Sequence, residues 1–281
     1  MKTRIPGALS DRAEAEAYFD FVQGADERTR QILDLETAHV AGAAVLSARN
    51  DSSGFWSRAQ GLGHDSPLTS ERLDEVCGYF RGRGHDSALL YFDSDVLPDD
   101  WAALSARHGL SAGPKFAKLV ADVDTVLTAA GQSKLDPSLR IAPATSDDAP
   151  TWGSVMCEIF GWSDVAGLPE MCAASVTRPE WAPFAVWAGE RMVGTANSHR
   201  YAGTAHMFGG GTLPEFRNRG AQTALLLARA EAAAAAGCTW LVAEAYAPED
   251  NSNPSLTNML RLGFEEYQRR PLWRWSRTEE P

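Results

Sequence analysis

Cysteines are few in this sequence, and it shows neither a secretion signal nor a membrane span. No cysteine belongs to a CxxC pair or to a Cys/His group with zinc spacing, so we expect reduced thiols and no metal site. The N-terminal MKTRIPGALS lacks an apolar core, and the most apolar long stretch, 221–237, carries Arg229 and Glu231. We therefore expect a cytoplasmic protein without a membrane partner. The four cysteines are Cys77, Cys157, Cys172 and Cys238.

Basic residues are also fewer than acidic residues. The 281 residues include 26 Lys and Arg against 37 Asp and Glu, which gives a formal net charge of -11. An acidic chain repels polyphosphate backbones at long range, so we expect no nucleic-acid partner. The hydrophobic share of 44% is ordinary for a globular protein that buries a core.

Strand and helix patterns alternate along the chain. Helical spacing covers 11–48, and helices are also predicted at 70–80, 99–108, 146–160, 221–236 and 255–262. Strands are predicted at 55–62, 88–92, 115–123, 140–142, 184–187, 192–199, 204–213 and 240–246, with a final strand or hairpin at 264–275.

A polar connection at 124–138 suggests a division into two domains, 1–123 and 139–281. The order strand, helix, strand, helix, strand occurs in 55–120 and again in 204–274, which favours an internal repeat. Generic α/β alternation is the alternative explanation.

The segment 212–223 has the pattern of an anion-binding loop. A strand ends at Leu213, and Pro214 cannot donate to a sheet, so the strand must stop or splay there. A helix then begins near Ala221. Its first amides have no intrahelical partner, and the helix dipole adds partial positive charge. Gly220 lacks a β-carbon, so a phosphate can approach the backbone closely.

These residues resemble the GNAT superfamily of N-acetyltransferases. LPEFRNRGAQTALL is similar to its pyrophosphate motif, R/Q-x-x-G-x-G/A, and NPSLTNMLRLGF is similar to its second cofactor segment. The resemblance extends over about 139–275. It implies an α/β protein with two tandem GNAT-like domains, each with a mostly antiparallel central sheet flanked by helices. The N-terminal half would be a degenerate, structural copy.

The resemblance implies acetyl-CoA as the acyl donor. Backbone amides of the loop would hold the pyrophosphate, Leu213 would pair with pantetheine, and Asn258 would reach the donor from the last helix. The full set of expected donor-binding residues is Leu213, Arg217, Asn218, Arg219, Gly220, Ala221, Gln222, Thr223 and Asn258.

The sequence departs from the family pattern at two positions. Gln222 stands where the motif has Gly or Ala, and a helix N-terminus tolerates such a side chain if it points outward. Met259 stands where many members have a tyrosine that protonates the departing thiolate. A thioether cannot donate a proton. Either another group performs that step or the thiolate leaves unassisted.

Three residues are candidates for proton transfer. His206 matches by loop length the position of a glutamate base in some members, and an imidazole suits the task. Glu244 lies in an apolar strand, where a carboxylate needs a use or a partner. Tyr246 could replace the missing tyrosine acid. The alternatives are a packed histidine, a structural salt bridge and core packing. His199 is a weaker candidate.

We expect the substrate to be a small molecule with an amine. The segment 152–181, which is rich in aromatic residues and contains a carboxylate, would form part of its pocket through Trp152, Phe160, Trp162, Glu170, Met171 and Trp181. The amine would attack the donor directly in a ternary complex. A non-catalytic acyl-CoA sensor is the alternative, and acyl transfer from an aminoacyl-tRNA is disfavoured by the acidic charge.

The N-terminal half has no phosphate motif. The letters RGRG at 81–84 follow a helix, and helix C-termini repel anions. This half is expected to cover a sheet edge and to help form the wall of the substrate cleft. One chain would then imitate a dimer, which favours a monomer over a homodimer.

Overall fold

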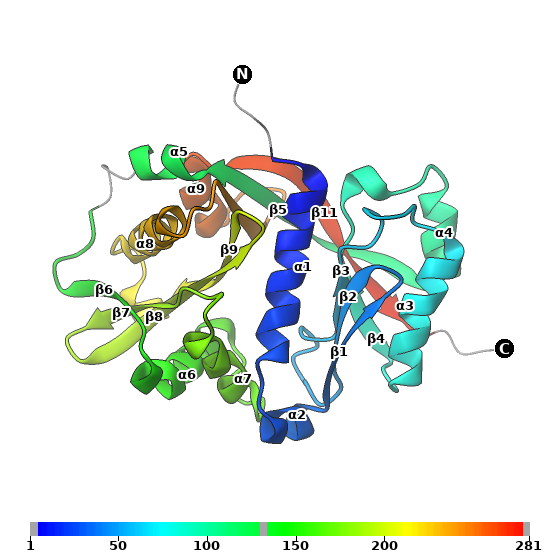
Figure 1. Cartoon of the computed structure of the whole chain (residues 1–281), viewed down its shortest axis with the longest axis horizontal. Coiled ribbons are helices and arrows are strands. Elements are labelled where there is room, and N and C mark those ends of the chain that lie inside the picture. The colour runs from blue at the N-terminus through cyan, green and yellow to red at the C-terminus, as the bar shows by residue number, and fades with distance from the viewer. Residues whose placement is uncertain (1–4, 130–133, 278–281) are drawn as a thin grey trace.

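The computed structural model describes residues 5–129 and 134–277, which build one continuous sheet flanked by helices (Figure 1). The first half contains α1 (Gly7–Gln23), α2 (Glu27–Leu33), β1 (Leu35–Val40), β2 (Ala43–Ala48), β3 (Arg58–Gln60), α3 (Ser70–Gly82), β4 (Ser87–Leu90), α4 (Trp101–Arg107), β5 (Leu110–Asp122) and α5 (Val123–Ala129). The second half contains β6 (Leu139–Pro143), α6 (Ala149–Phe160), α7 (Leu168–Ala174), β7 (Phe184–Ala188), β8 (Arg191–Tyr201), β9 (Thr204–Thr212), α8 (Ala221–Ala235), β10 (Trp240–Tyr246), α9 (Pro254–Arg261) and β11 (Glu265–Ser276).

The predicted helical pattern over 11–48 is wrong beyond residue 33. Instead of continuing as helix, 35–48 forms the antiparallel hairpin β1–β2. Its two-residue turn, Ala41–Gly42, has φ values of 52° and 91°, which match the twist of a tight hairpin. All six residues of β2 are buried. An apolar run buried on both faces has no period of two, so it cannot be distinguished from a helix by spacing.

The predicted helices at 70–80, 99–108, 146–160, 221–236 and 255–262 are present as α3, α4, α6, α8 and α9. The described strands form one 11-stranded sheet in the order β1-β2-β3-β4-β11-β5-β10-β9-β8-β7-β6. Within it only β3–β4 and β9–β10 pair in parallel, so the predicted mostly antiparallel α/β arrangement is confirmed. The two expected sheets are joined into one.

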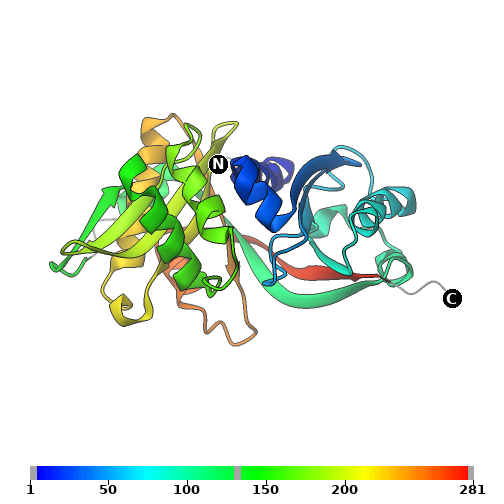
Figure 2. The same cartoon turned by 90° about the horizontal axis from the view of Figure 1, so that it is seen from below.

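The join is an exchange of strands between the halves. β5 pairs with β11 at the centre of the sheet, β5 also pairs with β10, and β11 also pairs with β4. Figure 2 shows these two long strands passing side by side from one half to the other. The order β3-α3-β4-α4-β5 is repeated as β9-α8-β10-α9-β11. The predicted repeat is therefore present in the topology, with the last strand of each half lying in the other half's sheet.

Helices cover both faces of the sheet near its centre. Ala243 of β10 packs in a cluster with residues of α5, α8 and α9, whereas Val242 packs with Ala13 of α1. Successive strand residues point to opposite faces. One face of this region is therefore covered by α1, which lies between the two halves in Figure 1, and the other by α8 and α9.

The segment 124–138, predicted as a polar connection, is partly helical. Helix α5 occupies its start and contacts α8. The residues 130–133 within it, including Gly131, lie outside the described part of the chain. The division into domains 1–123 and 139–281 stays a prediction. Among the described helices, none combines the length and apolar character that crossing a membrane requires.

The exchanged strand leads to a stability prediction. Trp275 of β11 is 1% exposed and packs in the core of the first half, with Phe80 and Leu90. Replacing it with alanine (Trp275→Ala) should lower the free energy of unfolding by about 3–5 kcal/mol, because a large buried ring leaves a cavity. Chemical denaturation measures the change.

The exposed neighbour Arg274 provides the control, since Arg274→Ala should change stability by no more than about 0.5 kcal/mol. Equal stability of Trp275→Ala and the parent protein would contradict the packing of β11 in the first half.

Candidate active site

The loop between β9 and α8 leaves backbone amides free at the start of α8. The chain passes through a short 3-10 turn (Pro214–Phe216), and Asn218 and Gly220 then adopt left-handed φ values of 61° and 79°. The first intrahelical bond runs from the Ala224 N–H to the Gly220 carbonyl. Gly220 supplies no side-chain cap. The amides of 221–223 therefore lack intrahelical partners, which is the geometry that an anion-binding helix start requires.

A cavity of about 650 Å³ opens in front of these amides. Arg217 and Arg261 bring positive charge to it, and the described residues that line it include no carboxylate. Of the expected donor-binding residues, the lining contains Arg217, Asn218, Gly220, Ala221, Gln222, Thr223 and Asn258. The cavity is thus electropositive in a protein of acidic net charge.

Two of the expected donor-binding residues do not line this cavity. The Leu213 side chain is buried in the core, its N–H donates to the Val193 carbonyl at 2.9 Å, and its carbonyl accepts from Phe216. The backbone of Leu213 thus already has partners on both sides. The Arg219 guanidinium donates to the Glu215 carbonyl and lies 5.3 Å from the Phe216 ring centroid. The binding of the donor by these two residues stays a prediction.

Gln222 connects α8 to α9 across one end of the cavity. Its Nε2 donates to the Ser255 hydroxyl, and its Oε1 accepts from the Asn258 amide, both at 2.6 Å. The side chain thus points away from the helix axis towards α9. This leaves the Gln222 backbone amide at the helix start, as the sequence analysis expects for a residue larger than Gly or Ala.

A second cavity lies where β9 and β10 separate. The two strands pair only between 204–207 and 240–243, and beyond these residues they diverge. The gap holds about 380 Å³ and shares lining residues with the first cavity. The shared residues are Phe160, Gly210, Gln222, Asn253 and Ser255. The electropositive cavity and this chamber therefore adjoin each other, and the two together are called the channel below.

Three consecutive glycines of β9, at 209–211, line the channel. Gly209 has a φ of 55°, and a β-carbon there would lie 2.8 Å from the Met156 methyl group. A β-carbon on Gly211 would overlap Ile159. On this side β9 has no strand partner beyond Met207, so its backbone groups face the channel. The run of three glycines at 209–211 is a signal that the sequence analysis missed.

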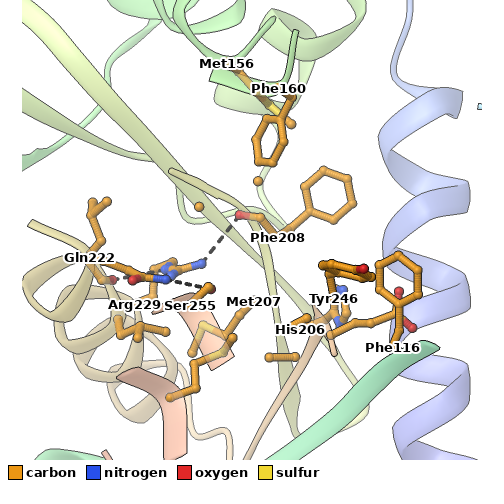
Figure 3. Close-up of a pocket in the computed structure, with 18 of the residues that line it drawn as sticks. Phe116, Met156, Phe160, His206, Met207, Phe208, Gln222, Arg229, Tyr246 and Ser255 are labelled. Carbon is orange, nitrogen blue, oxygen red and sulfur yellow. Dashed lines mark hydrogen bonds between the residues drawn. The ribbon is translucent and has the colours of Figure 1, made fainter. Parts of the chain in front are cut away.

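His206 and Glu244 lie on the face of the sheet covered by α1, and both line the chamber. Figure 3 shows His206 and Tyr246 beside α1, while Gln222, Arg229 and Ser255 lie on the side of α8 and α9. The chamber is therefore lined on one face of the sheet by residues beside α1 and on the other face by residues of α8 and α9.

Glu244 shares one cation with a second carboxylate. Nη2 of Arg270 is 3.0 Å from Glu244 Oε2 and 2.9 Å from Glu14 Oε1, and Lys118 pairs with Glu14 as well. Burial and the charge of Glu14 raise the pKa of Glu244 to about 7, against the opposing effect of Arg270. Burial also acts to raise the pKa of Glu14, but Lys118 and Arg270 lower it to about 2.

The other two candidates differ from Glu244 in their surroundings. His206 is 2% exposed, its Nδ1 has no hydrogen-bond partner among the described residues, and burial lowers its pKa to about 3. It is neutral at pH 7 and a weak base. Tyr246 is 49% exposed at the end of β10 and contacts the ring of Phe116. All three candidates line one chamber, and the pKa of Glu244 lies closer to neutrality than the pKa of His206.

Aromatic residues from both halves of the chain form much of the remaining chamber wall. Phe160 and Trp162 line it as expected, together with Tyr18, Phe55 and Trp56 from the first half. By contrast, Trp152, Met171 and Trp181 are buried in the core, and Glu170 borders a shallow surface hollow. His199 lies outside the chamber lining, against Trp181.

Sequence reasoning missed Glu14, Arg270, Arg229 and Arg261. Glu14 had a recognisable signal, because Asp11, Glu14 and Tyr18 recur at helical spacing and place acidic groups on a face that also carries apolar residues. Nothing local marks Arg270 as the partner of Glu244.

Comparisons with known proteins agree with this architecture. Residues 163–243 match the family model described as Acetyltransferase (GNAT) domain. A GCN5-related N-acetyltransferase from Kribbella flavida is 16% identical with a TM-score of 0.64, covering 98% of each chain. Another from Sphaerobacter thermophilus is 16% identical with a TM-score of 0.61, covering 97% of this chain and 94% of its own.

A tandem GNAT protein from the clavulanic acid biosynthesis pathway is 14% identical, with a TM-score of 0.61, and covers 97% of this chain and 98% of its own. A search of the curated proteins found no match. The second half thus matches the GNAT family model over residues 163–243, and over its full length the chain has the fold of a tandem GNAT protein.

Proposed function

We propose that this protein is an N-acetyltransferase that moves an acetyl group from acetyl-CoA to the amine of a small molecule. The observation that carries the proposal is that an electropositive cavity at a helix start adjoins a chamber containing Glu244. A thioester donor with a polyphosphate end and a long amide-bearing arm needs this combination. The smaller aromatic chamber favours a compact acceptor.

The residues that would bind the donor follow from the channel. The amides of 221–223 and the guanidinium groups of Arg217 and Arg261 would hold the pyrophosphate. The unpaired edge of β9 at 209–211 would bind the amides of the pantetheine arm by backbone hydrogen bonds, in place of Leu213. Asn258 would contact the donor from α9.

Direct attack of the amine fits the position of Glu244. The amine nitrogen bonds to the thioester carbonyl carbon, the carbon–sulfur bond breaks, and the electron pair leaves with the sulfur. Glu244 accepts the proton that the nitrogen loses. A carboxylate with a pKa of about 7 is a stronger base than an ordinary one and is still ionised in half of the molecules at that pH. His206 and Tyr246 stay candidates for orienting the acceptor or the leaving group.

A non-catalytic acyl-CoA sensor is the second candidate function. Met259 favours it, because this residue lines the chamber where a proton donor would be expected. The acetyltransferase and the sensor both require the donor site, so only turnover distinguishes them.

The test of the proposed function is thiol release from acetyl-CoA with a panel of amine-bearing small molecules. We expect release that depends on the amine, and at least about tenfold weaker acetyl-CoA binding in Arg217→Ala, because a charged hydrogen bond to phosphate is lost. Calorimetry measures the binding.

Arg191→Ala is the matched control, since Arg191 is exposed and pairs with Glu215 outside the cavity. Binding without turnover on any amine would favour the sensor. Equal affinity in the two arginine variants would refute the phosphate site.

The two glycines at the ends of α8 allow a test of the loop geometry. Gly220 and Gly237 have similar φ values of 79° and 75°, but a β-carbon at Gly220 would overlap the Lys134 carbonyl, whereas one at Gly237 meets nothing within 4 Å. Gly237→Ala should cost about 1–2 kcal/mol of stability from backbone strain alone. Gly220→Ala should cost more and should also weaken acetyl-CoA binding.

Urea denaturation and calorimetry provide the two readouts. If Gly220→Ala matched Gly237→Ala in both stability and affinity, the close approach of 134–135 to the loop would not be important for the site.

The raised pKa of Glu244 predicts the pH dependence of turnover. A general base must be ionised, so kcat/KM should rise as the pH increases through about 7. Glu244→Gln should remove this rise and lower kcat/KM by at least about 100-fold, since the proton acceptor is lost. His206→Gln should keep the rise, because the low pKa of His206 places its titration well below neutrality.

Steady-state kinetics with one acceptor across all variants keeps the titration of the amine itself constant. A parent-like profile in Glu244→Gln would exclude this residue as the base.

A further inference from the structure

A buried arginine of α8 lines the chamber without an anionic partner. Arg229 is 3% exposed. Its Nε donates to the Leu225 carbonyl at 3.0 Å, and its Nη1 donates to the carbonyls of Asn197 at 3.1 Å and Phe208 at 3.5 Å. Figure 3 shows the bond to Phe208. No carboxylate in the described part of the chain forms a salt bridge with it. Burial lowers the pKa of Arg229 to about 9, which still leaves the guanidinium charged at neutral pH.

The free edge of this guanidinium lies at the junction of the two cavities. A β-carbon on Gly210 would be 3.2 Å from Nη2 of Arg229, and Gly210 lines both the electropositive cavity and the chamber. Arg229 and Met259 both line the chamber, and they come from α8 and α9 on the same face of the sheet. Glu244 and His206 lie on the opposite face.

The hydrogen bonds to backbone carbonyls explain why a donor side chain lies here, but they do not explain why that side chain is charged. The carbonyls of Asn197 and Phe208 flank an irregularity in the β8–β9 pairing and need donors there. A neutral amide side chain could supply donors. A buried cation without a counterion costs several kcal/mol more than a neutral group, so its presence calls for a negative charge that arrives during the reaction.

We propose that Arg229 stabilises the coenzyme A thiolate that leaves when the acyl group is transferred. The inference rests on the proposed function. As the nitrogen–carbon bond forms and the carbon–sulfur bond breaks, the sulfur takes the electron pair and becomes negative. The guanidinium keeps its proton throughout, Glu244 accepts the proton of the amine, and the thiolate later takes a proton from water.

This assignment accounts for the absence of a proton donor at Met259. A fixed positive charge lowers the energy of a thiolate without transferring a proton to it. The two charged groups would then act from opposite faces of the sheet, with the base on the side of α1 and the cation on the side of α8. Arg229 would thereby stabilise the leaving thiolate by its charge, whereas a hydroxyl at position 259 would do so by transferring a proton.

The test measures the pKa of the thiol of free coenzyme A bound to the full-length protein. Ultraviolet absorbance of the thiolate is followed as the pH is raised, with and without protein. We expect the bound thiol to titrate at least about one pH unit below the free thiol, which is a tenfold larger thiolate fraction at a given pH. Arg229→Met should abolish the shift, and Arg229→Lys should keep part of it, because the charge is retained.

Circular dichroism and the Kd for coenzyme A establish that each variant is folded and binds. Arg191→Met, a change at an exposed arginine outside the channel, should leave the shift intact. Should Arg229→Met fail to fold, the parent protein and Arg229→Lys decide the question.

Three results would overturn the inference while leaving the proposed function in place. The bound thiol could titrate like the free thiol in the parent protein, or Arg229→Met could keep the full shift. Alternatively, malonyl-CoA could bind at least tenfold more tightly than acetyl-CoA in a manner that depends on Arg229, which would make the residue an anchor for a carboxylate on the acyl group. Failure of the parent protein to bind coenzyme A at all would refute the proposed function as well.

Discussion

The pairing of β5 with β11 at the centre of the sheet is the constraint on which the rest of the structure depends. Each strand completes the sheet of the other half, and each carries one buried cation, Lys118 in β5 and Arg270 in β11. Asp11 and Glu14 of α1 neutralise both. Because a buried charge without its partner costs about 3–5 kcal/mol, this cluster fixes α1 over the strand crossing.

The position of α1 in turn determines the chamber. Tyr18, one turn beyond Glu14, lines it, and Glu14 is the like charge that, together with burial, raises the pKa of Glu244. The first half of the chain lacks a phosphate loop, yet it supplies aromatic wall residues and a charge that acts on the candidate base. Two carboxylates beside Arg270 thus have pKa values on either side of the ordinary range, which is a common arrangement for acid–base chemistry.

Features that depend on residues close together in the sequence were predicted correctly, whereas features that depend on distant residues were not. The loop 217–223 could be predicted because an anion site at a strand end and helix start is a local property of the backbone. The hairpin at 35–48 could not, since its burial on both faces depends on neighbours distant in the sequence. Leu213 was assigned to the donor because its position in the motif does not reveal that Val193 and Phe216 already use its backbone.

The sequence by itself determined the repeated order of strand, helix, strand, helix and strand in the two halves and the electropositive helix start. Only the tertiary structure decided that the last strands exchange, that Glu244 shares Arg270 with Glu14, and that Arg229 faces the chamber without a carboxylate. The physical reason is that burial and charge pairing sum over groups far apart in the chain, so a pKa or a counterion exists only after folding brings those groups together.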